Sequence, residues 1–254
     1  MVDTHTHIYF NEFKAERKEI VDRAKAVGVR HFVLPNVDEE SLPLMKDFYE
    51  KFPDISSMAI GLHPTEVKDD WQKFFKLLDH ELSNGNYVGI GEVGVDLYWD
   101  KTMKESQLEA FEWHLRLAEE TKLPVIIHSR EAFKETVEVI EKVLPSVPLI
   151  FHSFTGSPDD VALIRNVCNP FFGINGVVTY KNAQSLRDAL PIIGIENIVL
   201  ETDSPYLSPV PHRGKRNESS YVAHVRDKVA EVLSISKEDV DKTTDRNAGK
   251  IFRI

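Results

Sequence analysis

The sequence is poor in cysteine and in basic residues, and it has no long apolar run. Cys168 is the only cysteine, so no disulfide can form within the chain and a zinc site built from thiolates is excluded. Its 41 acidic residues outnumber the 31 basic ones and give a formal net charge of -10, which excludes the broad basic surface of a typical duplex-binding protein. Any contact with nucleic acid must therefore be local.

Segments that span a membrane or direct secretion are also missing from the sequence. No window approaches the apolar length that a bilayer requires, and the first residues lack a basic region followed by an apolar stretch. There is no linker rich in Gly and Ser. These absences predict a soluble, cytoplasmic protein with a single domain over residues 1–254, which we expect to be a monomer without an obligate protein partner.

Short β-branched runs alternate with amphipathic stretches along the whole chain. Strands are expected at residues 2–6, 31–34, 57–62, 87–91, 124–128, 148–152, 171–174 and 197–201. Helical periodicity follows at residues 12–26, 39–51, 71–82, 103–122, 130–143, 158–166, 182–190 and 221–233. Eight such pairs in a chain of about 250 residues are typical of a (β/α)8 TIM barrel, an α/β fold with parallel strands inside and helices outside.

Two further segments follow the last expected strand. An extra C-terminal helix is expected at residues 237–251, because Ser236 and Asp239 form an acidic variant of the capping box. We expect this helix to pack across the exterior of the barrel. The longest irregular stretch covers residues 203–219, and a loop of this length in a compact domain is more often functional than idle.

Six apolar runs of strand length end in side chains that can bind a metal ion. These side chains are His5 with His7, His63, Glu92, His128, His152 and Asp203. Active-site residues of TIM barrels lie at the carboxyl ends of the strands, so these donors are expected to meet at one mouth of the barrel. Imidazole nitrogen and carboxylate oxygen together bind transition-metal cations. The pattern indicates a hydrolase with two metal ions.

The positions of the histidines, rather than their number, are the evidence for a metal site. His5 and His7 are two residues apart, so on a strand both rings point to the same side and can reach one ion. His128 and His152 each end an apolar run. Either one alone is more simply a core histidine bonded to a backbone carbonyl, but two at equivalent positions favour a shared site.

Glu92 and Asp203 are the candidate catalytic carboxylates. Gly89 and Gly91 leave space beside Glu92, whose two oxygens can each bind one ion and so bridge a pair about 3.5–4 Å apart. Asp203 ends a strand where an unpaired carboxylate would be costly. It can bind a metal and also take a proton from the attacking water. Glu201 is expected to form a salt bridge behind the metal ligands.

Basic residues that could bind phosphate stand in two loops. Arg213, Lys215 and Arg216 follow the last expected strand, and guanidinium and ammonium groups are the donors that bind phosphate in proteins. The alternative is a solvated basic loop. Arg130, just after His128, is a further candidate for an anion contact.

Aromatic residues give a less specific signal. Tyr180 and Tyr206 can either stack on a base or pack at the rim of the barrel, and the pattern leaves both alternatives open. Trp99 and Trp113 lie in loop or helical surroundings and are expected in the core.

Seven segments in order carry a resemblance that covers the whole chain. They are Asp3-Thr-His-Thr-His, Gly61-Leu-His-Pro, Gly89-Ile-Gly-Glu-Val-Gly-Val-Asp, His128-Ser-Arg, His152-Ser-Phe-Thr-Gly, Glu201-Thr-Asp-Ser-Pro-Tyr-Leu and Arg213-Gly-Lys-Arg-Asn-Glu. Together they resemble the TatD-type metal-dependent deoxyribonucleases, which belong to the wider amidohydrolase group of TIM barrel hydrolases.

The resemblance implies a specific set of ligands. It implies one ion held by His5, His7, Glu92 and Asp203, and a second held by Glu92, His128 and His152, with Glu92 as the bridge. It places His63 near the substrate phosphate rather than on a metal. These ligand types permit zinc, manganese, nickel or iron and do not exclude magnesium.

Three functions remain open at this point. The first is hydrolysis of phosphodiester bonds in DNA by a metal-activated water, and the small basic cluster favours a 3′–5′ exonuclease that grips a strand end or a single strand. The second is an amidase, lactonase or esterase, including a deacylase of aminoacylated nucleic acid. Many such enzymes bridge their metals with a modified lysine, so Glu92 favours the nuclease. The third is a metal-stabilised binding scaffold without catalysis, whose site would be closed to water.

Overall fold

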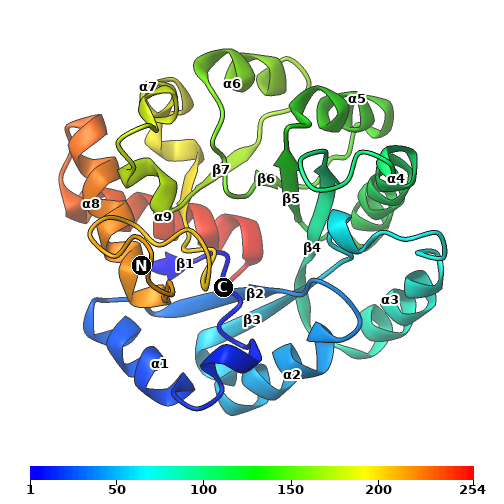
Figure 1. The fold of residues 1–254 in the computed structure, drawn as a ribbon, viewed down its shortest axis with the longest axis horizontal. Helices are drawn as coiled ribbons and strands as arrows, with labels where there is room; N and C mark the ends of the chain where they lie inside the picture. Colours follow the sequence, from blue (N-terminus) through cyan, green and yellow to red (C-terminus); the bar gives the residue numbers. More distant parts are fainter.

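The computed structural model describes residues 1–254, and its eight strands form one parallel sheet that curls into a barrel (Figure 1). The strands are β1 (Val2–Asp3), β2 (His31–Pro35), β3 (Ser56–Ile60), β4 (Tyr87–Asp96), β5 (Val125–Arg130), β6 (Leu149–Phe151), β7 (Phe171–Ile174) and β8 (Ile198–Leu200). Their order in the sheet follows the chain, and each strand pairs in parallel with the next. The predicted (β/α)8 barrel is confirmed.

The first eight helices along the chain surround this ring of strands, and the last one lies behind it (Figure 1). They are α1 (Arg17–Ala26), α2 (Ser41–Lys51), α3 (Lys73–Asn84), α4 (Lys104–Thr121), α5 (Phe133–Val143), α6 (Pro158–Arg165), α7 (Gln184–Ile193), α8 (Val222–Leu233) and α9 (Lys237–Phe252). Short 3-10 turns occur at Asn11–Phe13, Pro53–Ile55, Pro64–Glu66, Gly176–Thr179, Ile195–Asn197 and Ser219–Tyr221. No helix combines the length and the apolar character needed to cross a lipid bilayer.

Three elements have bounds that differ clearly from the prediction. The strand expected at residues 2–6 is reduced to Val2–Asp3. The helix expected from residue 12 begins at Arg17, because a 3-10 turn anchored by the buried Phe13 precedes it. Strand β4 continues past Gly91 to Asp96, since the buried Val93 and Val95 extend the pairing with β5. The longer β4 carries Glu92 inside the strand rather than at its end.

Helix α9 forms as predicted, but the expectation that it packs on the exterior of the barrel is wrong. The Ser236 hydroxyl oxygen accepts a hydrogen bond from the Asp239 N–H at 3.0 Å and so caps its first turn. In Figure 1 the red helix lies behind the strands. Its Ile251 and Phe252 pack in one cluster with five residues of the barrel interior: Val33, Ala59, Ile126, Ile150 and Val199. The helix therefore covers one end of the barrel, because the apolar residues at that end need cover from water.

Strand alternation places metal-capable side chains in the layer above this apolar cluster. Three residues of the cluster each precede such a side chain by two positions: Ile126 before His128, Ile150 before His152, and Val199 before Glu201. Residues i and i+2 of a strand point to the same side, so these side chains also face the barrel interior. The apolar floor and the polar layer are thus built by the same strands.

The junction between β8 and β1 has single hydrogen bonds in place of a ladder. The Asp203 N–H donates to the His5 carbonyl at 2.9 Å, and the His7 N–H donates to the Ser204 carbonyl at 2.8 Å. An isolated parallel bridge joins Thr6 to Ser204. These bonds hold the segment of His5 and His7 directly beside Asp203.

Candidate metal centre

A cavity of about 600 Å³ opens at the carboxyl ends of the strands. Its lining includes His7, His63, Glu92, His128, His152 and Asp203. His5 is completely buried and contacts Glu92 and His7 from below. The structure therefore brings together every metal-capable side chain that ends an apolar run in the sequence.

One oxygen of Glu92 belongs to a first donor group with His5, His7 and Asp203. Glu92 Oε2 lies 3.1 Å from His5 Nε2 and 3.7 Å from His7 Nε2, and these two nitrogens are 3.3 Å apart. Asp203 Oδ1 lies 3.9 and 3.7 Å from the same nitrogens. Donors bound at about 2.0–2.1 Å to a tetrahedral ion stand roughly 3.3–3.4 Å apart, so this spacing fits a shared cation.

The other oxygen of Glu92 belongs to a second donor group. Glu92 Oε1 lies 2.8 Å from His128 Nδ1 and 2.8 Å from His152 Nε2. His63 Nε2 is also close, at 3.4 Å from the same oxygen and 3.3 Å from His128 Nδ1. His63, Glu92 and His128 are near enough to share an ion, so His63 stands among the donors as well as at the cavity wall.

Burial sets the charge of the first donor group. It lowers the pKa of His5 to about 4 and that of His7 to about 3, so both rings are neutral at pH 7 and free to donate a lone pair to a cation. Burial raises the pKa of Asp203 to about 8. It also opposes ionisation of Glu92, but nearby His152 and His5 outweigh burial and hold the Glu92 pKa well below its usual range. A buried carboxylate such as Asp203 needs a cation to be ionised, which fits a metal site.

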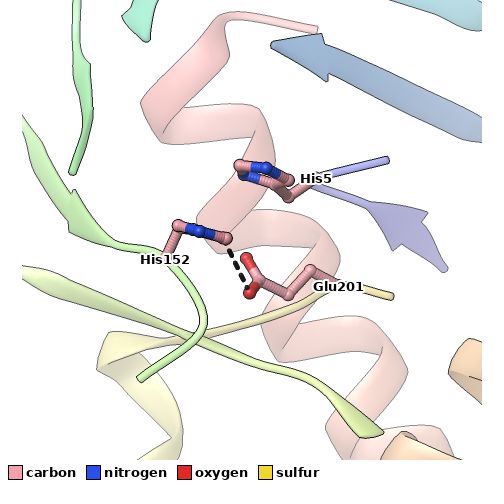
Figure 2. A group of neighbouring side chains, drawn as sticks. All are labelled: His5, His152 and Glu201. Carbon is pink, nitrogen blue, oxygen red and sulfur yellow. Dashed lines mark ion pairs between the residues drawn. The ribbon is translucent and has the colours of Figure 1, made fainter. Parts of the chain in front are cut away.

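Glu201 lies beside His5 and His152 and forms an ion pair with His152, as Figure 2 shows. Its Oε1 lies 3.4 Å from His152 Nδ1 and accepts a hydrogen bond from the Ser153 N–H at 2.6 Å, so the expected salt bridge behind the metal ligands is present. The His5 and His152 rings stack with centroids 3.8 Å apart. A Cβ atom on Gly173 would lie 2.2 Å from Glu201 Oε2, so the space for this carboxylate requires glycine there.

Several buried polar atoms around these rings have no hydrogen-bond partner. They are His5 Nδ1, Glu201 Oε2 and His152 Nδ1, the last of which has the ion pair with Glu201 Oε1 at 3.4 Å but no hydrogen bond. Buried polar atoms in proteins are normally paired, and the exceptions concentrate where an ion or water belongs. His5 and His152 present their Nε2 atoms to Glu92, so these unpaired atoms are not themselves members of the two donor groups. The mixed nitrogen and oxygen donors of the two groups fit a centre that takes up divalent cations.

Two further buried residues hold metal-capable histidines in place, and the sequence reasoning assigned neither of them a role. Asp96 Oδ2 lies 2.9 Å from His128 Nε2 at the end of β4. The Tyr9 hydroxyl lies 3.0 Å from His7 Nδ1 and donates to the Pro35 carbonyl at 2.5 Å. For Asp96 the signal was alternation, since it lies four positions after Glu92 on β4. Tyr9 lies in a turn, where no such pattern applies.

Of the four basic residues proposed to bind phosphate, Arg130 lines the cavity. It is the only Lys or Arg among the 19 lining residues. Arg213 and Lys215 are exposed and lie outside the lining. Arg216 also lies outside it and forms an ion pair with Glu16 at 2.7 Å.

The expectation that Trp99 belongs to the core is wrong. Its side chain is 68% exposed and lines the cavity mouth. The turn after β4 directs the Trp99 side chain outward. The hydrophobicity of the sequence gives no information about that direction. Trp113 does pack against the core and stacks on Phe75 with ring centroids 3.3 Å apart.

Comparisons with known proteins place the chain among metal-dependent hydrolases. The family model described as TatD related DNase matches residues 2–253. The uncharacterized metal-dependent hydrolase YabD of Bacillus subtilis is 34% identical over 255 residues, which cover 100% of this chain and 99% of that protein. The uncharacterized metal-dependent hydrolase TatD of Mycobacterium tuberculosis is 31% identical over 261 residues, which cover 99% of this chain and 97% of that protein.

Solved structures show the same architecture. The crystal structure of YJJV, a TatD homolog from Escherichia coli K12, superposes with a TM-score of 0.93 at 25% identity and covers 100% of this chain and 98% of its own. A phosphotriesterase homology protein from Escherichia coli, complexed with phosphate in its active site, has a TM-score of 0.73 at 13% identity and covers 99% of this chain and 98% of its own. The second likeness shows the fold alone. The family match and the relatives together establish that the chain belongs to the TatD related DNase family of metal-dependent hydrolases.

Proposed function

We propose that the protein is a deoxyribonuclease that uses two divalent metal ions to hydrolyse phosphodiester bonds at the 3′ end of single-stranded DNA. The position of Glu92 carries the proposal. Its two carboxylate oxygens face two separate donor groups, each within 3.1 Å of a histidine nitrogen. A carboxylate with this geometry can bridge two ions about 3.5–4 Å apart, the spacing of two-metal phosphodiesterases.

Each residue then has a stated task. His5, His7 and Asp203 would hold one ion, and His128 and His152 would hold the other, with Glu92 shared by both groups. Zinc, manganese, nickel and magnesium are the candidate ions. When bound, they would polarise the phosphoryl oxygens and lower the pKa of the attacking water.

Asp203 would receive the proton of the water, because it lines the cavity and its side chain is the least buried of the first donor group, at 13% exposed. Arg130 and His63 bind the nonbridging phosphate oxygens. Arg130 is the only guanidinium or ammonium group that lines the cavity, and one such group suits a single phosphate better than a long backbone.

The test is release of nucleotides from a 5′-labelled single-stranded oligonucleotide with each candidate metal in turn. We expect a ladder of products that shorten from the 3′ end, and its loss with a chelator or in Asp203→Asn. The matched control is Asp54→Asn, which changes an exposed aspartate at the opposite end of the barrel. Hydrolysis of esters or lactones without any cleavage of DNA would overturn the nuclease and favour the esterase alternative.

A further inference from the structure

Large apolar side chains are exposed around the mouth of the metal-capable cavity. Tyr98, Trp99, Tyr206 and Leu207 are 50%, 68%, 55% and 36% exposed, and the last three line the cavity. Exposed aromatic residues that gather at one opening mark a site that binds a ligand.

On one side of the mouth, two aromatic rings and a guanidinium form a stack that we call the aromatic platform: Tyr98, Trp99 and Arg130. Arg130 Cζ lies 3.9 Å from the centre of the Tyr98 ring and 5.5 Å from that of Trp99. The two rings meet edge to face with centroids 5.1 Å apart. Arg130 is thereby held against the rings while its side chain still lines the cavity.

The aromatic platform is fixed to the metal centre through one carboxylate. Asp96 Oδ1 accepts hydrogen bonds from the backbone N–H groups of Tyr98 at 2.9 Å and of Trp99 at 3.0 Å. Its other oxygen lies 2.9 Å from His128 Nε2. The Gln107 side-chain oxygen accepts from the Asp96 N–H at 2.8 Å and anchors the turn to α4. A ring bound on Trp99 would therefore stand at a set position relative to a metal-binding histidine.

We infer that the aromatic platform binds the unpaired nucleobase next to the scissile phosphate, with its face on Trp99 and the adjoining phosphate on Arg130. The inference rests on the proposed function and deepens it. Aromatic side chains stack on any base, and arginine adds a cation–π contact and a phosphate contact. In a duplex both faces of a base are covered by its neighbours, so the platform selects a single strand or a frayed end.

The experiment combines two substrates with two variants. One substrate is a single-stranded oligonucleotide, and the other carries tetrahydrofuran abasic residues at its last two 3′ positions. Removal of the bases should lower kcat/KM of the wild type on the order of 10-fold, the effect of losing one stacked base. Trp99→Ala should lower kcat/KM by a similar factor on the normal strand and by less than about twofold on the abasic strand. Trp99→Phe keeps a ring and should keep most of the activity.

The matched control is Leu144→Ala, which truncates another exposed apolar side chain, 67% exposed, beside the amino end of β6. It should leave both substrates unaffected. Equal effects of Trp99→Ala on both strands, or no effect on either, would overturn the aromatic platform while leaving the nuclease intact.

A binding measurement separates this inference from the proposed function. Fluorescence anisotropy of a labelled phosphorothioate strand reports binding to the metal-loaded protein without cleavage. If the wild type cleaves no DNA but binds the strand in a way that needs both Trp99 and the terminal bases, the platform stands and the nuclease falls. If binding is independent of Trp99, the platform falls.

Discussion

The buried carboxylate of Asp3 accepts two hydrogen bonds from Thr202, one from its backbone N–H at 2.9 Å and one from its hydroxyl at 2.7 Å. The two residues are separated by 199 positions in the chain and lie where β1 meets the segment after β8. Asp3 lies two positions before the metal-capable His5, and Thr202 directly precedes the metal-capable Asp203. The pair therefore fixes the first donor group across the junction of the barrel.

Asp3→Ala should lower the free energy of unfolding by about 2–3 kcal/mol, because it leaves the Thr202 groups without a buried acceptor. Thr202→Val removes the hydroxyl alone and should cost less. Urea unfolding of both single variants and of the double variant, with chelator present, measures the effect. The double variant should lose less than the sum of the two single losses, and strictly additive losses would show that the two residues act independently.

Glu92→Gln should reduce the number of ions bound by each chain, because the neutral amide cannot supply charge to both donor groups. We expect two zinc ions in the wild type and one or none in the variant, measured by mass spectrometry of the metal content after dialysis. Glu66→Gln is the matched control, since Glu66 lines the same cavity without joining either donor group. Two ions retained by Glu92→Gln would exclude the bridge.

Arg130→Gln should lower kcat/KM for single-stranded DNA on the order of 10- to 100-fold, the loss of about 1.5–3 kcal/mol for a hydrogen bond to a charged group. Arg216→Gln should change it by less than about twofold, since Arg216 is paired with Glu16 and lies outside the cavity. Steady-state kinetics of both variants decides between the two arginines. A larger effect of Arg216 would return the phosphate site to the loop after β8.

His114 should make the protein less stable in mild acid. It is 1% exposed, and burial lowers its pKa to about 4 from about 6.5 in the unfolded chain. The folded state therefore favours the neutral ring, so the stability is fully present above pH 6.5 and is lost as the pH falls toward 4. At pH 5 the loss is about 2 kcal/mol relative to pH 7.5.

His114→Leu removes this titration, so the variant should lose about 2 kcal/mol less than the wild type between pH 7.5 and pH 5. Urea unfolding at both pH values, with chelator to remove the contribution of metals, gives the comparison. The same pH dependence in both proteins would show that other groups are responsible.

The sequence by itself determined the barrel and the set of metal-capable donors. Both depend on local patterns, since β-branched runs favour strands and a spacing of two residues keeps His5 and His7 on one face. Ile126 before His128 and Ile150 before His152 obey the same rule, so the apolar floor and the donors above it could be inferred from alternation alone.

The tertiary structure decided what depends on segments far apart in the chain. Arg216 pairs with Glu16, 200 positions away, and lies outside the cavity, whereas Arg130 lines it. Trp99 is exposed in a turn whose backbone is bonded to Asp96. Helix α9 closes one end of the barrel because Ile251 and Phe252 pack with residues of five strands there. Hydrophobicity along the chain indicates whether a residue favours burial. Only the packed fold determines which neighbouring residues bury it.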